Sequence, residues 1–333
     1  VAKSLTYTDV SDRPAQLLTS KNLWNDGTRS VVLKAGDATV DQYEKLLIEV
    51  AKNTGTLSGG VLDDVSALTK GGSAIVLTGA TKVVAKLAAN GSDKDLSGVE
   101  LDSVVTAIDL NKQAAILDAN DLDNATITIN GGSYSVKDTS SNVAGLDAAK
   151  YATKAVTITN EATADNLKTI TDGNAASIAY TQLTDSASKI SGTLANIKAG
   201  VTVKVNDKAK GSELKAITDK ATAVTATLDL AKVEDSMVEL EKVKTLLKDR
   251  TVTLTGTASA AKYKAILDES PTSFAGAVSD TVTALTDGKT LSLTGATSVT
   301  AVLDAGGGDK DLTGVKLDSK VTVINLNSQA ATL

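Results

Sequence analysis

Histidine and cysteine are both absent from this chain of 333 residues. Without histidine there is no imidazole base for a Ser-His-Asp or Cys-His arrangement, and no His-Glu-x-x-His zinc site. Without cysteine there is no thiolate nucleophile, zinc finger, iron–sulfur cluster or disulfide. Any catalysis would therefore depend on carboxylate, lysine, serine or backbone groups.

Large and rigid side chains are scarce as well. The sequence has one Trp, one Phe, one Met, two Pro and six Tyr. Hydrophobic residues nevertheless make up 42% of the chain, a share typical of folded proteins. The core must therefore consist of Val, Leu, Ile, Ala and Thr methyl groups, and such small side chains suit a uniform repeated layer better than an irregular pocket.

The charge balance is acidic. Lysine and arginine number 34 against 40 aspartates and glutamates, which gives a net charge of −6. Nucleic-acid binding needs a basic field and aromatic stacking platforms, so we expect no nucleic-acid partner. No apolar run approaches the roughly 18 to 20 residues of a membrane helix, which predicts that the chain does not span a membrane.

A long internal duplication dominates the sequence. Residues 77–117 return as residues 293–333 with 28 of 41 positions identical and no gap. Such self-similarity is the signature of a repeat architecture. Because the second copy stops at a point where the first continues, we expect that the natural polypeptide goes on beyond Leu333.

A finer period lies within the large one. Residues 155–173 match residues 201–220, with Leu167 and Leu214 lying 47 positions apart. A strand that carries a tyrosine precedes each of them, with Tyr134 and Tyr180 lying 46 positions apart, and Tyr7 begins a similar order at the N-terminus. The repeating module is therefore about 45 residues long and contains two strand-plus-helix turns.

Local patterns predict short strands alternating with helices. Period-two alternation of β-branched residues predicts strands at 156–160, 201–205, 251–255, 290–294 and 321–325. A capping box from Thr39 to Gln42 predicts a helix that begins there. A second helix is predicted over 231–250 from one apolar stripe, formed by Val233, Met237, Leu240, Val243 and Leu247.

These elements predict an α/β repeat protein, in which short strands and short helices form a solenoid-like stack. A row of tandem small α/β or β-rich domains is the alternative. Residues 126–136 place Asn-Gly between two alternating runs, a pattern that predicts an antiparallel hairpin and hence a mixed sheet or hairpin-containing modules.

We divide the chain into five parts on the repeat pattern. Residues 1–60 form a strand-helix module, and residues 61–130 contain the first long copy. Residues 131–220 hold two tandem modules of about 45 residues, and residues 221–274 are richer in helix. Residues 275–333 contain the second, truncated copy.

Acidic clusters in Gly- and Asn-rich segments are the candidate metal site. Several carboxylates on such loops can converge on a hard cation, and calcium would be the natural occupant. Solvated turns are the simpler interpretation of the same residues and the one we favour, because Asp and Gly are common in turns. No catalytic or cofactor-binding residues stand out. The candidate calcium ligands are Asp93, Asp95, Asp118, Asp121, Asp123, Asp309 and Asp311.

The tyrosines at Tyr7, Tyr134 and Tyr180 have two interpretations. They could form a binding stripe for a sugar or a protein partner. We favour the interpretation that they pack at the same position of successive modules, because a periodic aromatic side chain in a repeat protein usually occupies the equivalent core position in each repeat.

The composition and the modules around 178–190 and 201–217 resemble the repeats of giant secreted bacterial surface proteins. The protein classes that the repeats resemble most are cyanobacterial and proteobacterial surface-layer proteins and giant adhesins. The resemblance implies an extracellular, non-catalytic repeat protein at the bacterial cell surface, often dependent on calcium. This chain lacks the calcium-binding β-roll nonapeptide of many such proteins.

These observations lead to a structural role as our functional expectation. We expect a surface layer, sheath or fibre built by self-association, with cell-surface polysaccharide as a further candidate partner and no required cofactor. The stalk of a giant adhesin is the alternative. A carbohydrate-active enzyme on a solenoid scaffold is a minor third reading.

Overall fold

The computed structural model describes residues 9–21, 30–34, 36–52, 54–69, 75, 77–89, 94–123, 127–286, 293–304 and 311–332. The chain divides into two compact units. Unit 1 comprises Val1–Asn160 with Thr169–Ala179, and unit 2 comprises Glu161–Lys168 with Tyr180–Leu333. Helix α5 (Ala164–Asp172) contributes residues to both.

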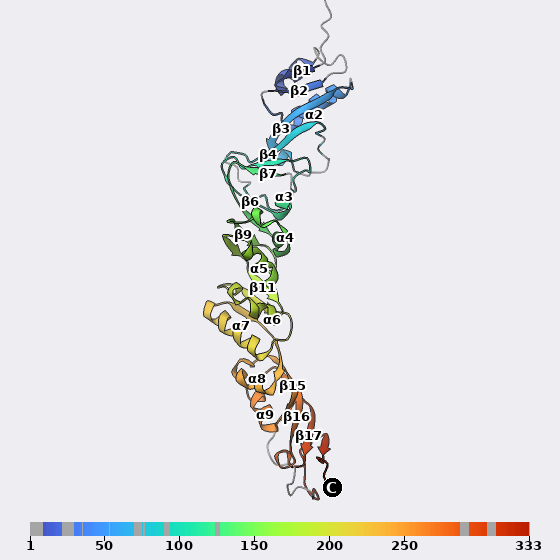
Figure 1. The fold of residues 1–333 in the computed structure, drawn as a ribbon, viewed down its shortest axis with the longest axis vertical. Helices are drawn as coiled ribbons and strands as arrows, with labels where there is room; N and C mark the ends of the chain where they lie inside the picture. Colours follow the sequence, from blue (N-terminus) through green and yellow to red (C-terminus); the bar gives the residue numbers. More distant parts are fainter. Residues whose placement is uncertain are drawn as a thin grey trace, which may run out of the picture. The chain divides into compact units, whose positions relative to one another are not determined.

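Unit 1 contains two sheets, ordered β1-β2-β3-β4-β5-β7 and β10-β9-β8-β6 (Figure 1). Short helices lie between many of the strands along the chain. The elements are β1 (Asp9–Asp12), α1 (Pro14–Thr19), β2 (Ser30–Leu33), α2 (Val40–Ala51), β3 (Thr56–Asp64), β4 (Ala80–Lys86), β5 (Ala107–Asp109), β6 (Ala114–Leu117), α3 (Ala119–Asp123), β7 (Thr128–Asn130), β8 (Ser133–Asp138), α4 (Ser140–Gly145), β9 (Ala155–Ile158) and β10 (Ser177–Ala179).

Unit 2 also contains two sheets, ordered β11-β12-β13 and β14-β15-β16-β17-β18. Its helices again fall between consecutive strands. The elements are β11 (Gln182–Asp185), α6 (Ala187–Gly192), β12 (Thr202–Val205), α7 (Gly211–Val224), β13 (Thr227–Asp229), β14 (Lys232–Ser236), α8 (Met237–Lys242), β15 (Thr251–Ala258), α9 (Ala260–Leu267), β16 (Ser273–Thr281), β17 (Ala296–Val302) and β18 (Val323–Asn325).

Every pairing between these strands is parallel. Antiparallel geometry occurs in two isolated bridges, Thr69 with Leu101 and Thr286 with Leu317. Parallel neighbours need a crossover connection, and here short helices and turns supply it. The predicted α/β class is confirmed at this level: mostly parallel sheets of short strands, with few helices.

The core is aliphatic and follows the period of two along the strands. Val156 and Ile158 in β9, like Val203 and Val205 in β12, are buried while their neighbours are more exposed. The helices that follow contribute the predicted repeat positions, since Leu167 and Leu214 are both almost fully buried. Equivalent positions of the 47-residue period therefore occupy equivalent places in the core.

Helix α2 and most predicted strands agree with the sequence patterns. Thr39 accepts a hydrogen bond from the Gln42 N–H, and Gln42 Oε1 accepts one from the Thr39 N–H, which completes the capping box. Strands β9, β12, β15 and β18 fall within or overlap their predicted ranges. The predicted strand at 290–294 lies largely outside the described residues.

The predicted single helix over 231–250 is wrong. Residues Lys232–Ser236 form strand β14, the helix α8 begins only at Met237, and a 3-10 turn covers Lys244–Leu246. The apolar stripe is buried, but three elements share it. Val233 pairs with Val252 of β15, so tertiary strand pairing overrides the helical spacing.

The predicted hairpin at 126–136 is also wrong. Strand β7 pairs in parallel with β5, and β8 pairs in parallel with β6 and β9. The Asn-Gly-Gly segment between β7 and β8 is a corner that follows the corner at 110–113, as shown by hydrogen bonds from Leu110 N–H to Asn130 O and from Ser133 N–H to Gln113 O. The turn therefore bends one strand path and does not reverse it.

The structural repeat extends beyond the matched segments 77–117 and 293–333 to the elements that precede each of them. Tyr43 of α2 donates a hydrogen bond to the Thr78 carbonyl at 3.2 Å, and Tyr263 of α9 donates to the Thr294 carbonyl at 3.3 Å. Burial raises the pKa of each tyrosine to about 12, so both hydroxyls are donors at neutral pH. The helix-strand pairs α2–β3 and α9–β16 therefore belong to the same repeat as β4 and β17.

Gly79 follows Thr78 at a site where only glycine fits. Its φ is +84°, and an added Cβ would collide with the Leu57 carbonyl oxygen. Gly98 has a similar φ of +88° but has nothing within 4 Å of an added Cβ. An alanine at Gly98 would therefore meet backbone strain alone, whereas an alanine at Gly79 would meet both the strain and the steric clash.

We expect Gly79→Ala to lower the free energy of unfolding more than Gly98→Ala. Both substitutions carry roughly 1 kcal/mol of left-handed backbone strain. The clash at Gly79 adds on the order of 1–3 kcal/mol. Denaturant titration followed by circular dichroism measures the difference, and equal losses would contradict the close approach at Leu57.

Candidate functional site: carboxylates that cap helix N-termini

Two of the predicted calcium ligands, Asp93 and Asp309, lie outside the described residues. Asp95 accepts hydrogen bonds from the backbone and hydroxyl of Ser97 and forms an ion pair with Lys137 at 2.8 Å. The bond from Lys137, and then that from Ser97, lowers the pKa of Asp95. Asp311 accepts a hydrogen bond from the Thr313 N–H at 2.9 Å. Both aspartates thus stabilise turns of their own segment.

Asp118, Asp121 and Asp123 lie at helix α3 and not on the loop that the sequence indicates. Asp118 bridges two backbone groups: Oδ1 accepts from the Asp121 N–H, and Oδ2 accepts from the Gly98 N–H, each at 3.0 Å. Asp123 is exposed to solvent. The three predicted ligands therefore have three different environments.

Asp121 is the carboxylate of this group that the structure leaves unsatisfied. Its side chain is 6% exposed, and no described residue donates a hydrogen bond to its Oδ2 atom. Burial, followed by repulsion from Asp118, raises its pKa to about 7. A pocket of about 210 Å³, lined by Asp102, Asp118 and Asn120 among others, lies beside it.

Calcium binding remains a prediction after this placement. Within the described ranges, no group of three or more acidic side chains is arranged to hold a metal ion. Both carboxylate oxygens of Asp118 accept hydrogen bonds from backbone N–H groups. A cation at Asp118 would compete with those two hydrogen bonds for the same oxygens.

A different set of polar side chains, six aspartates and one asparagine, shares a repeated geometry that the sequence patterns above do not indicate. The first N–H of seven helices donates to a side-chain oxygen at or near the end of a later strand, 19 to 24 residues along the chain, at 2.7 to 3.1 Å. We call these side chains the capping set. Its members are Asp63, Asp138, Asn160, Asp185, Asp207, Asp235 and Asp280, which cap Val40, Ala119, Ser140, Ala164, Ala187, Gly211 and Ala260 respectively.

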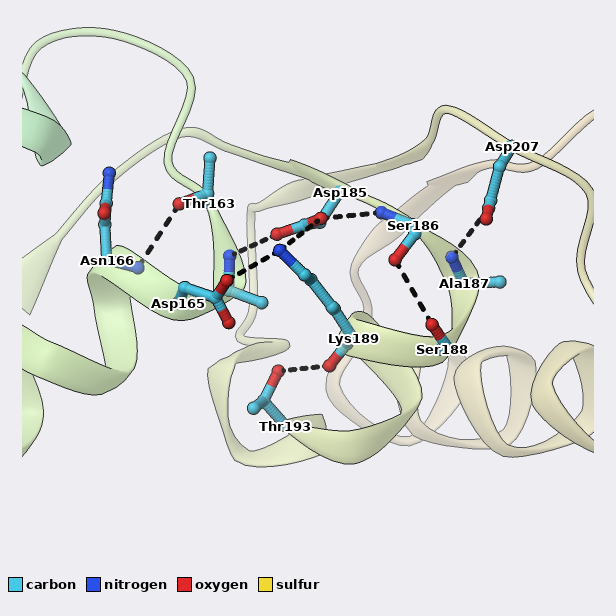
Figure 2. Close-up of polar contacts among 11 residues, drawn as sticks. Thr163, Asp165, Asn166, Asp185, Ser186, Ala187, Ser188, Lys189, Thr193 and Asp207 are labelled. Carbon is cyan, nitrogen blue, oxygen red and sulfur yellow. Dashed lines mark hydrogen bonds and ion pairs between the residues drawn. The ribbon is translucent and has the colours of Figure 1, made fainter.

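Asp185 shows the arrangement in detail (Figure 2). Its Oδ2 accepts from the Ala164 N–H at 3.1 Å, and its Oδ1 accepts from the Ser186 N–H at 2.8 Å. Ser186 is the N-cap residue of α6, whereas Ala164 is the first residue of α5. One carboxylate therefore joins the N-terminal ends of two successive helices.

The same double use recurs in other members of the set. Asp63, Asp138, Asp235 and Asp280 each accept from the N–H of the next residue through Oδ1 and from the earlier helix through Oδ2. The first N–H groups of a helix have no partner within the helix, and the helix dipole concentrates positive charge there. A carboxylate between two such ends satisfies both donors.

Six of the seven capped helices begin with Gly, Ala or Ser, and the exception is α2, which begins with Val40. Ala164 and Ala187 are fully buried, and a Cβ added at Gly211 would lie only 3.1 Å from the Glu239 carbonyl oxygen, a tight contact. The later strand must pass close to the helix end for the bond to form. Helix α1 begins with Pro14, which has no N–H to donate, and no described side chain caps it in this way.

Lys189 adds a charge contact beside Asp185, as Figure 2 shows. Its Nζ lies 2.6 Å from Asp165 and 3.8 Å from Asp185. The bond to Asp165, with the nearby charges, raises the pKa of Lys189. Because the lysine is exposed, this pair stabilises the fold by much less than the backbone caps do.

The tyrosines predicted to pack do so with one polar contact each. Tyr134 donates to the Lys150 carbonyl at 2.6 Å, and Tyr180 donates to the Asn196 carbonyl. A lysine lies over each ring, Lys154 at 4.8 Å and Lys198 at 5.4 Å from the ring centre. Tyr7 lies outside the described residues. These contacts match the packing interpretation at the two described positions.

A second pocket of about 300 Å³ lies near Asp95. Its polar lining includes Asp64, Lys86, Lys94 and Gln113, and its walls are otherwise largely apolar. Asp95 is already engaged by Lys137 and Ser97. The pocket offers room for a small molecule, but nothing in its geometry assigns a reaction to it.

Replacing Asp185 with alanine should destabilise unit 2. Two N–H groups, the buried one of Ala164 and the partly buried one of Ser186, lose their charged acceptor, which costs about 2 kcal/mol. Asp185→Asn should lose less, because Asn160 performs the capping role with an amide oxygen. Asp219→Ala serves as the control, since it removes only an exposed i,i+4 pair with Lys215 worth roughly 0.5 kcal/mol or less. Equal denaturation midpoints for the Asp185→Ala and Asp219→Ala variants would contradict the capping role.

Asp121 should make stability depend on pH near neutrality. The folded chain keeps this carboxyl protonated up to about pH 7, whereas the unfolded chain releases the proton near its ordinary value of 3.8. The folded state therefore binds more protons between these values, and the Asp121 contribution falls as pH rises through the window. The slope is at most about 1.4 kcal/mol per pH unit for one proton.

Asp121→Asn should flatten that part of the profile, and Asp123→Asn, on the same helix but exposed, should leave it unchanged. Urea unfolding of the three proteins from pH 4.5 to 8 measures the slopes. Parallel profiles for the parent and Asp121→Asn would show that Asp121 titrates normally.

Comparison with known proteins adds no assignment. No protein-family model matches this chain, and no curated protein sequence matches it. Among the described residues, no helix has both the length and the apolar character needed to cross a membrane. The functional argument therefore depends on the geometry of the chain itself.

Proposed function

We propose that this chain is a structural repeat protein of a bacterial cell surface, which assembles with its own copies into a layer, sheath or fibre. The observation that carries the proposal is the capping set, in which six aspartates and one asparagine, at or just after the ends of later strands, bind the first N–H of earlier helices. Each such bond ties one repeat turn to the next.

Successive turns of a solenoid would produce this pattern. Each strand lies parallel to a neighbour close in the chain, and equivalent aliphatic residues of the 47-residue period are buried in equivalent places. In repeat proteins, each unit contacts mainly its neighbours, and the ends remain able to take another unit. Assembly through such ends is the physical route from this architecture to a polymer.

The use of the acidic groups favours a mechanical role over catalysis. In several aspartates both carboxylate oxygens accept hydrogen bonds from backbone N–H groups. They are Asp118, Asp138, Asp185, Asp235 and Asp280. A general acid or base needs a carboxyl that can reach the substrate. These side chains hold backbone together, which is the requirement of a load-carrying protein.

An adhesin stalk remains the alternative, and assembly separates it from a surface-layer subunit. We expect the purified chain to show concentration-dependent sedimentation and ordered assemblies by negative-stain microscopy. A stalk stays monomeric under the same conditions. Monomers at every accessible concentration would therefore refute the leading proposal and favour the stalk.

Calcium, if the acidic segments bind it, should strengthen the assembly. We expect chelation with EGTA to lower the melting temperature and loosen the assemblies, and we expect added calcium to restore both. Magnesium at the same concentration serves as the control for ionic strength. An unchanged melting temperature and assembly in EGTA would remove calcium from the proposal.

A further inference from the structure

The Asn-Gly pair at Asn130 and Gly131 forms a corner whose side chain has no structural task. The corner lies between β7 and β8, which belong to the two different sheets of unit 1. The Leu110 N–H donates to the Asn130 carbonyl oxygen at 2.8 Å, and the Ser133 N–H donates to the Gln113 carbonyl oxygen at 3.3 Å. These bonds hold the main chain of the corner and leave the Asn130 amide outside it.

The backbone nitrogen that follows Asn130 is open to reaction. Asn130 and Gly131 are both exposed to solvent. Among the described residues, none accepts a hydrogen bond from the Gly131 N–H, and none bonds the side-chain amide of Asn130. Gly131 has a φ of +74° and carries no Cβ that would shield its nitrogen.

A free nitrogen beside an asparagine amide can close a ring. The Gly131 nitrogen attacks Cγ of Asn130 and forms a new C–N bond. The side-chain amide takes up the proton of the Gly131 N–H and leaves as ammonia, so a succinimide remains. Water then opens the ring. Opening at Cγ gives aspartate, and opening at the main-chain carbonyl gives isoaspartate, in which the chain runs through the former side chain.

The corner has little room for the longer main chain of isoaspartate. A Cβ added at the neighbouring Gly132 would collide with the Gln113 carbonyl oxygen, so the two corners lie in close contact. In isoaspartate the Asn130 carbonyl, which accepts the Leu110 N–H, becomes a free carboxylate and leaves the main-chain path. The product therefore disturbs the contact between the two corners.

The new charge is also unfavourable at this position. Position 130 pairs with Asp109 of β5 in the parallel register. Asp109 Oδ1 lies so near that a Cβ added at Gly131 would be 2.6 Å from it. Like charges at paired positions of a sheet repel each other, so aspartate and isoaspartate both add repulsion here.

We propose that Asn130–Gly131 is a site of spontaneous chemical modification in the folded chain, which converts Asn130 to aspartate and isoaspartate and thereby loosens the corner between β7 and β8. Water is the co-reactant, and ammonia is the product that leaves. The attacking nitrogen must lose its proton, so the reaction should accelerate as pH rises. The inference is independent of the proposed function.

Asn174 provides an internal control in the same chain. It is exposed, and its carbonyl oxygen accepts a hydrogen bond from the Thr153 N–H at 2.8 Å, as that of Asn130 does from Leu110. The N–H of Ala175 has no acceptor among the described residues. The site therefore resembles Asn130–Gly131 but places a Cβ beside the attacking nitrogen.

The test incubates the whole chain at pH 8, folded in one sample and unfolded in guanidinium chloride in the other. Peptide mapping by mass spectrometry, with detection of isoaspartate, follows each asparagine. We expect Asn130 of the folded chain to convert roughly tenfold faster than Asn174, because glycine leaves the nitrogen unshielded. Conversion of Asn130 only in the unfolded sample, or no faster than that of Asn174, overturns the proposal.

Two variants test the effect on the corner. After equal incubation, the parent should unfold at a lower denaturant concentration than the fresh parent. Asn130→Gln, whose longer side chain closes a ring far more slowly, should keep its own fresh midpoint. Asn130→Asp has the charge with an ordinary main chain and should lose less than the isoaspartate form. An isoaspartate-rich parent that unfolds like the fresh one overturns the loosening of the corner.

Discussion

The unpaired N–H at the start of each helix is the constraint on which this structure depends. A short helix leaves a large share of its backbone donors without an internal partner, and many helices here are short. Asp138, Asp185 and their counterparts satisfy the first donor from a strand about 20 residues later. The folding of one turn therefore depends on the arrival of the next.

This dependence explains several other features of the chain. Six of the seven capped helices begin with a small residue, such as Ala164 or Gly211, which lets the later strand come close to the helix end; α2, which begins with Val40, is the exception. A carboxylate suits the position because it can accept from two N–H groups at once.

The duplication gives one sequence pattern in two environments. Ile108 is 0% exposed beside β7, whereas its counterpart Ile324 is 38% exposed and has β17 as its neighbour among the described strands. The difference shows that the burial of these residues belongs to the next strand and not to the pattern itself.

The sequence alone determined the class of the fold and its period. Alternating β-branched residues located β9 and β12, the Thr39 capping box located α2, and the 47-residue spacing placed Leu167 and Leu214 in equivalent core positions. These features depend on interactions between residues close in the chain or on simple burial, so local patterns record them.

Only the tertiary structure decided which strands pair and what the acidic residues do. The Asn-Gly segment turned as a corner because strands before and after it lie beside earlier strands, and Val233 became strand because Val252 pairs with it. The partner of Asp185 is a backbone N–H 21 residues away at Ala164. The recurring Asp-Ser or Asp-Thr pair at a strand end, as in Asp185-Ser186, is visible in the sequence, but the backbone donor at Ala164 has no side-chain signature, so the pattern does not name its partner.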